Sequence, residues 1–195
     1  MISLSSTTKW SRPIRWLHLG LFLTITAQLF LSLVMAGPDD KHQTFIQHAT
    51  LITHEYVGLL AAAIILIHWV YLAAAERVTF EHLFPWTGRG IGEVFGELGG
   101  LLRLRLPDES EQGGLAGFIH GLGLLLATAM GFTGTVMYFM LQAGRMESAG
   151  YHTAAFIHGT LANLMWAYWI GHGLIAILHQ LLGHDTLRGM FRLGR

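Results

Sequence analysis

Four long apolar stretches, separated by shorter polar segments, dominate the hydrophobic pattern of this chain. They cover about residues 13–35, 51–75, 115–141 and 153–180. Each is close to or above the roughly 20 apolar residues that a helix needs to cross a bilayer. The pattern predicts an all-α integral membrane protein, a four-helix bundle in which residues 1–195 form a single membrane domain.

The first apolar stretch also has features of a secretory signal, because a basic flank precedes it and Ala36 could serve as a cleavage position. Its apolar run of about 19 residues is longer than the 7–15 residues of a signal core. It also carries His18 and Gln28, which a discarded peptide would not need. We therefore expect a retained membrane helix.

The longest connection, residues 76–114, joins the second and third stretches. Its residues 86–106 alternate apolar side chains with arginine and glutamate, which is typical of an amphipathic helix lying in the membrane interface. The glycines in this segment lower its helix propensity. We expect an interfacial helix here, followed by a loop over residues 106–113.

Lysine and arginine are distributed unequally between the two sides of the predicted bundle. The amino-terminal flank, the 76–114 connection and the carboxyl-terminal tail hold ten of the twelve, whereas the other two loops hold only Lys41 and Arg145. Positive residues accumulate on the cytoplasmic side of membrane proteins. We expect both termini in the cytoplasm and a multi-pass location in the membrane.

The composition excludes several classes of function. The chain is 52% hydrophobic and 12% charged, against about 25% charged in soluble domains, and its net charge of zero gives no indication of nucleic-acid binding. The absence of cysteine excludes Fe–S clusters, thiolate zinc sites, covalently attached haem and disulfides. No paired carboxylates, Ser–His–Asp set or phosphate loop supports hydrolysis or phosphoryl transfer. The twelve histidines remain as the abundant candidate ligands.

Histidines in the fourth apolar stretch provide the clearest chemical signal. Residues 151–182 contain no Asp, Glu, Lys or Arg but include His158, His172 and His179. Ionisable side chains inside a membrane are costly and by default indicate a functional site. His158 and His172 are 14 residues apart, so on a helix they share nearly one face at a separation of about 21 Å. This spacing suits two metal centres, one near each membrane surface.

The predicted topology pairs histidines from different helices at two depths. His54 and His158 lie near the outer ends of their helices, and His18 and His172 lie toward the cytoplasmic side. Two imidazoles on one iron are the ligation of a b-type haem that only transfers electrons. Bundle cores commonly hold such cofactors. The pattern therefore predicts two axial histidine pairs.

An alternative for the inner pair is His68, which lies 14 residues after His54 and at a depth similar to that of His172. His68 could then replace His18. Among other residues, Arg15 lies one turn before His18, where it could pair with a haem propionate or act only as a cytoplasmic positive charge. His120 is expected near the cytoplasmic surface, either beside a quinone or proton path or as an interfacial histidine.

Uncharged residues near these histidines have two possible roles. Gly58, one turn beyond His54, could leave room for a haem plate, although glycine is also common in ordinary membrane-helix packing. Gln28, Asn163 and Thr133 are polar residues within the apolar stretches, and we expect them to form hydrogen bonds between helices.

Four motifs together resemble the bacterial cytochrome b561 and hydrogenase/formate dehydrogenase cytochrome b superfamily. They are RWLH at 15–18, H-x3-G at 54–58, LLATAMGFTG at 125–134 and H-x13-H at 158–172. The resemblance covers nearly the whole chain. The long 76–114 connection and the presence of His68 are closer to the gamma subunit of formate dehydrogenase than to the short stand-alone type.

The resemblance implies two haems b, an outer one held by His54 and His158 and an inner one held by His18 and His172. It also implies an electron-transfer subunit of a respiratory oxidoreductase that is not catalytic alone. Such a subunit carries electrons between a periplasmic dehydrogenase-type or hydrogenase-type partner and membrane quinone. His68 and His120 are additional to this pattern.

Two other functions are compatible with the same scaffold. One is a stand-alone oxidoreductase that passes electrons from a small molecule such as superoxide to quinone, which the scarcity of basic residues on the outer side disfavours. The other is a histidine-based proton or metal transporter. Transport commonly uses acidic residues within the membrane, and Glu55 is the only carboxylate near the interior of a predicted membrane helix.

Overall fold

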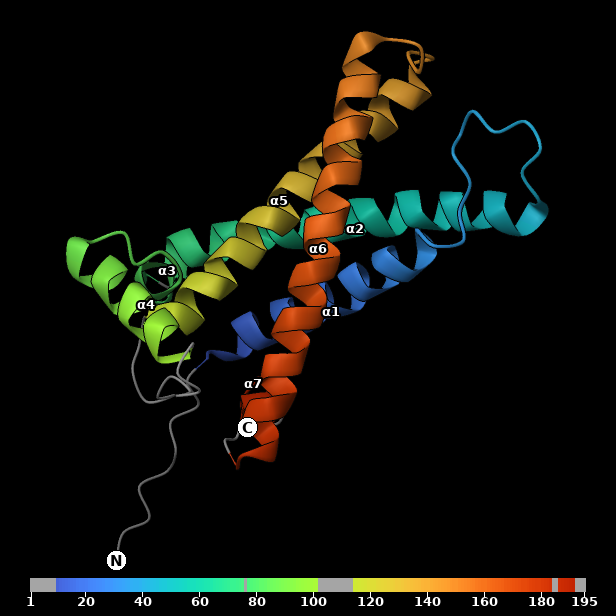
Figure 1. Ribbon diagram of the computed structural model, residues 1–195. Coiled ribbons are helices and arrows are strands. Elements are labelled where there is room, and N and C mark those ends of the chain that lie inside the picture. The colour runs from blue at the N-terminus through green and yellow to red at the C-terminus, as the bar shows by residue number, and fades with distance from the viewer. Residues whose placement is uncertain (1–9, 76, 102–113, 184–185, 192–195) are drawn as a thin grey trace, which may run out of the picture. The chain divides into compact units, whose positions relative to one another are not determined.

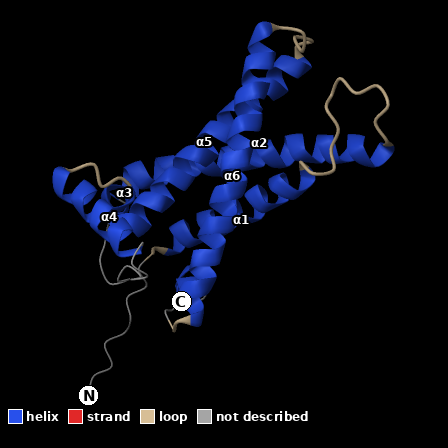
Figure 2. Ribbon diagram, in the orientation of Figure 1, coloured by secondary structure: helices blue, strands red, loops and turns tan. Residues whose placement is uncertain are grey.

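The structure, a computed structural model, describes residues 10–75, 77–101, 114–183 and 186–191. All regular elements within these ranges are helices, which confirms the predicted all-α fold (Figures 1 and 2). In chain order they are α1 (Arg12–Leu31), α2 (Phe45–Ala75), α3 (Arg77–Leu83), α4 (Gly88–Leu101), α5 (Gly114–Gln142), α6 (Ala149–Leu181) and α7 (Thr186–Phe191).

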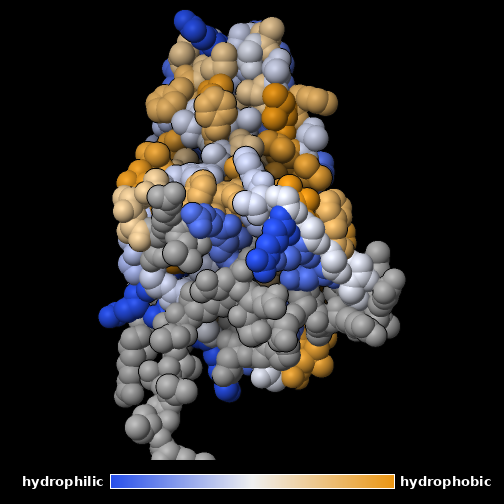
Figure 3. Space-filling view, turned by 90° about the vertical axis from the view of Figure 1, so that its left-hand side faces the viewer, coloured by the Kyte–Doolittle hydropathy of each residue, from blue (hydrophilic) through white to orange (hydrophobic). Residues whose placement is uncertain are grey.

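Four of these helices, α1, α2, α5 and α6, are long and apolar enough to cross a membrane, at 20, 31, 29 and 33 residues. Large apolar side chains stay exposed along them, including Leu66 (66%), Phe132 (69%) and Phe156 (76%). Apolar side chains also lie at the surface on the face seen in Figure 3. Contiguous apolar surface of this kind is typical of contact with lipid. The prediction of a multi-pass membrane protein is confirmed.

The second membrane helix begins six residues before the predicted start at residue 51. The Thr44 hydroxyl accepts a hydrogen bond from the Gln47 backbone N–H at 3.3 Å, and the Gln47 side chain accepts one from the Thr44 backbone N–H at 2.9 Å. This reciprocal pair is a capping box, which satisfies backbone donors at a helix start. The segment 45–50 is therefore helical, although its polar side chains had indicated a loop.

Two further boundaries differ from prediction for local reasons. Helix α1 ends at Leu31 instead of residue 35, because the backbone changes there to a tighter turn, with i→i−3 hydrogen bonds from the Leu33 and Val34 N–H groups at 3.2 and 3.0 Å. Helix α6 begins at Ala149 instead of residue 153, because the Ser148 hydroxyl accepts a hydrogen bond from the Tyr151 N–H at 3.2 Å. Ser148 thus acts as the N-cap of the helix.

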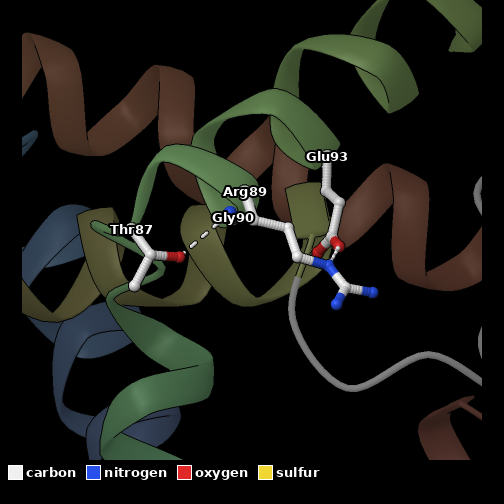
Figure 4. Close-up of polar contacts among 4 residues, drawn as sticks. All are labelled: Thr87, Arg89, Gly90 and Glu93. Carbon is white, nitrogen blue, oxygen red and sulfur yellow. Dashed lines mark hydrogen bonds and ion pairs between the residues drawn. The ribbon is translucent and has the colours of Figure 1, made fainter.

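The connection between α2 and α5 contains two short helices, α3 and α4, where one was predicted. At the start of α4 the Thr87 hydroxyl accepts a hydrogen bond from the Gly90 N–H at 3.1 Å (Figure 4). Arg89 and Glu93 form an exposed ion pair of 3.0 Å on the same helix (Figure 4). The predicted end of this helix at residue 106 and the predicted loop over 106–113 lie outside the described residues.

The chain divides into two compact units, residues 1–64 with 166–195 and residues 65–165, and the prediction of a single domain stays a prediction. In the second unit both short helices pack against α5. The Glu97 carboxylate on α4 accepts a hydrogen bond from the Leu115 N–H at 2.9 Å in the first turn of α5. A Cβ on Gly117 or Gly121 would overlap the carbonyls at the end of α3. These glycines therefore permit close packing of α3 on α5.

In the first unit α1 packs against α7, a helix that the sequence pattern did not predict. Trp169 on α6 donates its indole N–H to the Thr26 hydroxyl on α1 at 3.0 Å. Phe30 lies edge-on to Trp166 and Trp169, with ring centroids 5.6 and 6.0 Å away. These aromatic contacts hold the carboxyl-terminal half of α6 against α1.

Candidate functional site

The imidazoles of His18 on α1 and His172 on α6 lie together in the first unit. Their ring centroids are 6.4 Å apart and their planes make an angle of 57°. Two imidazoles that bind one metal ion through bonds of about 2 Å have centroids about 6 Å apart. The structure therefore brings together the two residues predicted as the inner pair, at a separation suited to a shared metal ion.

Aromatic side chains surround this histidine pair. Tyr168, one turn before His172 on α6, stacks on its ring at a centroid distance of 5.3 Å and an angle of 6°. Phe191 on α7 contacts His18 edge-on at 5.9 Å and Phe22 at 5.7 Å. Such pairs contribute about 0.5–1.5 kcal/mol each beyond the burial of their area. The packing restricts the orientation of both imidazoles.

His54 lies on α2, and its backbone carbonyl is held from α1. The side-chain amide of Gln28 donates a hydrogen bond of 2.6 Å to this carbonyl. A Cβ on Gly58 would lie 3.2 Å from the same amide nitrogen. The space beside Gly58, where room for a haem plate was considered, is occupied by the Gln28 side chain. The expected hydrogen bond of Gln28 between helices is present.

His158 on α6 is seated against α5 in the second unit. The Thr133 hydroxyl oxygen lies 2.9 Å from the His158 Nδ1, and Thr133 is 8% exposed. A Cβ on Gly134 would lie 3.1 Å from the His158 Cε1. His54 belongs to the first unit and His158 to the second. Their pairing stays a prediction.

The remaining candidates differ in their surroundings. Arg15 is 1% exposed, unlike an ordinary surface charge. His68 is 8% exposed, and its Nδ1 makes no hydrogen bond to any residue that the structure describes. The Nδ1 of His120 lies 2.7 Å from the Ala116 carbonyl of its own helix, as an interfacial histidine would. The structure does not test the roles of these residues as ligands.

Sequence analysis missed the partners of Thr133 and Gln28 and the contact of Phe191 with His18. Thr133 and Gln28 were recognisable as polar residues in apolar stretches, but a single sequence does not say which face of a membrane helix meets which neighbour. Phe191 lies in a basic tail with no clear helical period. A pair of imidazoles flanked by aromatic side chains, as in His18 and His172, is able to hold a redox-active metal group.

Comparison with known proteins gives one strong match. The family model described as prokaryotic cytochrome b561 matches residues 9–193. Neither the curated proteins nor the solved structures gave a match. The matched range includes every histidine singled out above.

Proposed function

The chain belongs to the prokaryotic cytochrome b561 family, and from this premise we propose that it is a two-haem cytochrome linking a periplasmic redox partner to membrane quinone. Family membership and the four long apolar helices make it a membrane-embedded b-type cytochrome that functions in electron transfer. The number of haems, their ligands and the partners at either end are the parts that we propose.

We assign His18 and His172 to an inner haem and His54 and His158 to an outer haem. The observation that carries the inner assignment is the 6.4 Å separation of the His18 and His172 rings. That separation fits two axial imidazoles on one iron, as estimated above from metal–nitrogen bond lengths. His158 and His172 lie on one continuous helix, so their 14-residue spacing separates the two levels by about 21 Å.

In this assignment the four histidines would hold the haems as ligands, and each haem would supply one-electron redox chemistry. The protein would bind and orient the group through these histidines. The stacking of Tyr168 on His172 and the contact of Phe191 with His18 keep the inner imidazoles in place. We propose a location in the bacterial inner (plasma) membrane, and the distribution of Lys and Arg supports an orientation with the inner level toward the cytoplasm.

We propose that Arg15 pairs with a propionate of the inner haem. Arg15 is a buried cation, 1% exposed, and a guanidinium matches the geometry of a carboxylate such as a propionate. Arg15 lies three residues before His18 on α1, which places it within one turn of the proposed ligand. His120, bonded to its own helix, is a weaker candidate for the quinone side.

The experiment that tests the proposal is a reduced-minus-oxidised optical spectrum of the purified protein. We expect the α-band of a b-type haem in the wild type, reduced amplitude in His158→Ala and His172→Ala, and full amplitude in the control His152→Ala, whose side chain is exposed. Absence of b-type absorption in the wild type, or full amplitude in both ligand variants, would contradict it.

A second experiment addresses the partner. We expect solubilisation in mild detergent to retain an oxidoreductase subunit that reduces or oxidises the haem, with quinone as the exchangeable substrate. If the isolated chain alone oxidised superoxide and reduced quinone, with no subunit retained, the stand-alone function would replace the proposed one.

A further inference from the structure

We propose that Thr133 is a positioning residue that holds His158 in the tautomer protonated at Nδ1, in which Nε2 would be the nitrogen that binds iron. The inference rests on the proposed function, because it concerns the imidazole that we assign to the outer haem. It adds a role for a residue on a different helix from the ligand.

The Thr133 hydroxyl is placed among three groups inside the second unit. Its oxygen lies 2.9 Å from the His158 Nδ1, 2.8 Å from the Ala129 carbonyl and 3.1 Å from the Met130 carbonyl. Thr133 is itself 8% exposed. The imidazole also interacts with the Met130 backbone.

The carbonyls of Ala129 and Met130 both lie within hydrogen-bond distance of the Thr133 hydroxyl, and we infer that its single proton goes to one of them. A hydroxyl has one proton and two acceptor lone pairs, and a carbonyl only accepts. If the Thr133 proton is donated to the Ala129 carbonyl, the hydroxyl oxygen accepts a proton from the His158 Nδ1. Protonation at Nδ1 supplies the proton that the hydroxyl accepts, and Nε2 would then be the nitrogen that binds a metal ion.

The neighbouring Gly134 restricts the ring sterically. A Cβ at Gly134 would lie 3.1 Å from the His158 Cε1 and 3.6 Å from its Nδ1. Helix α5 therefore approaches the same edge of the imidazole that the Thr133 hydroxyl binds. The Thr133 hydroxyl therefore contacts the ring directly, and the absence of a side chain at Gly134 leaves the space that the ring occupies.

The consequence for an iron ligand follows from outer-shell chemistry. A histidine whose second nitrogen donates to an acceptor is a more basic ligand, and such partners commonly affect metal affinity by about 10–100-fold. A more basic imidazole stabilises the oxidised iron relative to the reduced iron. Loss of the Thr133 hydroxyl therefore raises the midpoint potential of one haem and leaves the other unchanged.

The test is a redox titration of the haem absorbance in the full-length protein and its variants. The Thr133→Val variant keeps the shape of the side chain and removes the hydroxyl. We expect the affinity of the protein for oxidised haem, relative to its affinity for reduced haem, to fall about three- to tenfold. At about 59 mV per tenfold change for one electron, this is a rise of roughly 30–60 mV in one potential. This effect is smaller than the roughly 10–100-fold that outer-shell partners commonly produce, because the interaction with the Met130 backbone remains. Thr133→Ser restores the wild-type value.

The matched control is Thr160→Val, since the exposed Thr160 hydroxyl bonds only to the Phe156 carbonyl of its own helix at 2.8 Å among the described contacts. Both potentials stay at wild-type values in this control. Unchanged potentials in Thr133→Val, or a shift that Thr133→Ser does not reverse, would overturn the inference. Thr133→Ala provides the same comparison if the valine variant does not assemble. A wild type without haem would instead overturn the proposed function.

Discussion

The side-chain amide of Gln28 on α1 donates a 2.6 Å hydrogen bond to the backbone carbonyl of His54 on α2. This bond ties α1 to the residue that we assign to the outer haem. It also accounts for Gly58, because the amide nitrogen would lie 3.2 Å from a Cβ at that position. The glycine of the H-x3-G motif admits a polar side chain from the neighbouring helix.

Replacing Gln28 by leucine removes the donor and keeps a similar volume. We expect the free energy of unfolding in detergent to fall by about 0.6 kcal/mol and by no more than roughly 1.7 kcal/mol, the range of hydrogen bonds between membrane helices. Asn163→Ala is the matched control, because the Asn163 amide bonds to the Gly159 carbonyl of its own helix at 3.2 Å. Equal losses in the two variants would show that the Gln28 bond does not join the helices.

The Gly58 position allows a test of coupling with Gln28. Gly58→Ala alone is expected to be destabilising or neutral, since crowding of the amide offsets the gain in helix propensity. In a Gln28→Ala background the same change is expected to stabilise by up to about 1 kcal/mol, because alanine favours helix over glycine. The measurement is a double-mutant cycle of unfolding free energies. A Gly58→Ala effect of the same sign and size in both backgrounds would contradict the packing described here.

Two glutamates on α4 make contrasting contributions. Glu97 accepts a hydrogen bond from the Leu115 N–H at the start of α5, so Glu97→Ala is expected to cost about 1 kcal/mol, the usual loss of a capping group. Glu93 pairs only with the highly exposed Arg89 among the described contacts, and Glu93→Ala is expected to cost at most about 0.5 kcal/mol. Thermal unfolding of both variants measures the two losses of stability. A larger loss in Glu93→Ala than in Glu97→Ala would contradict these roles.

The sequence was sufficient for the four membrane helices because their apolar runs are long and uninterrupted. It was also sufficient to bring His18 and His172 to one level, since the order of the helices and the position of each histidine along its helix determine depth. The sequence prediction placed the start of α2 too late in the chain, although Thr44 and Gln47 have the spacing of a capping box. The role of Gly58 was open, and only the contact with Gln28 resolved its surroundings.

The sequence could not predict the rotation of each helix about its own axis. Helices that are apolar on every side have no polar face to indicate which residues point inward. Thr133 was therefore visible as a polar residue, but its contact with His158 depends on how α5 and α6 face each other. Phe191 illustrates a second limit, because a short helix such as α7 has too few residues for a recognisable period and is stabilised mainly by its packing.

The most direct test of the central claim is the haem-to-protein ratio of the purified protein with His18 and His172 replaced singly and together. The account predicts two haems per chain in the wild type and in His68→Ala. It predicts one haem in His18→Ala, one in His172→Ala and one in the double variant, because both imidazoles bind the same iron. A double variant that loses both haems, or a His68→Ala variant that loses the haem of His172 while His18→Ala keeps it, would contradict the account.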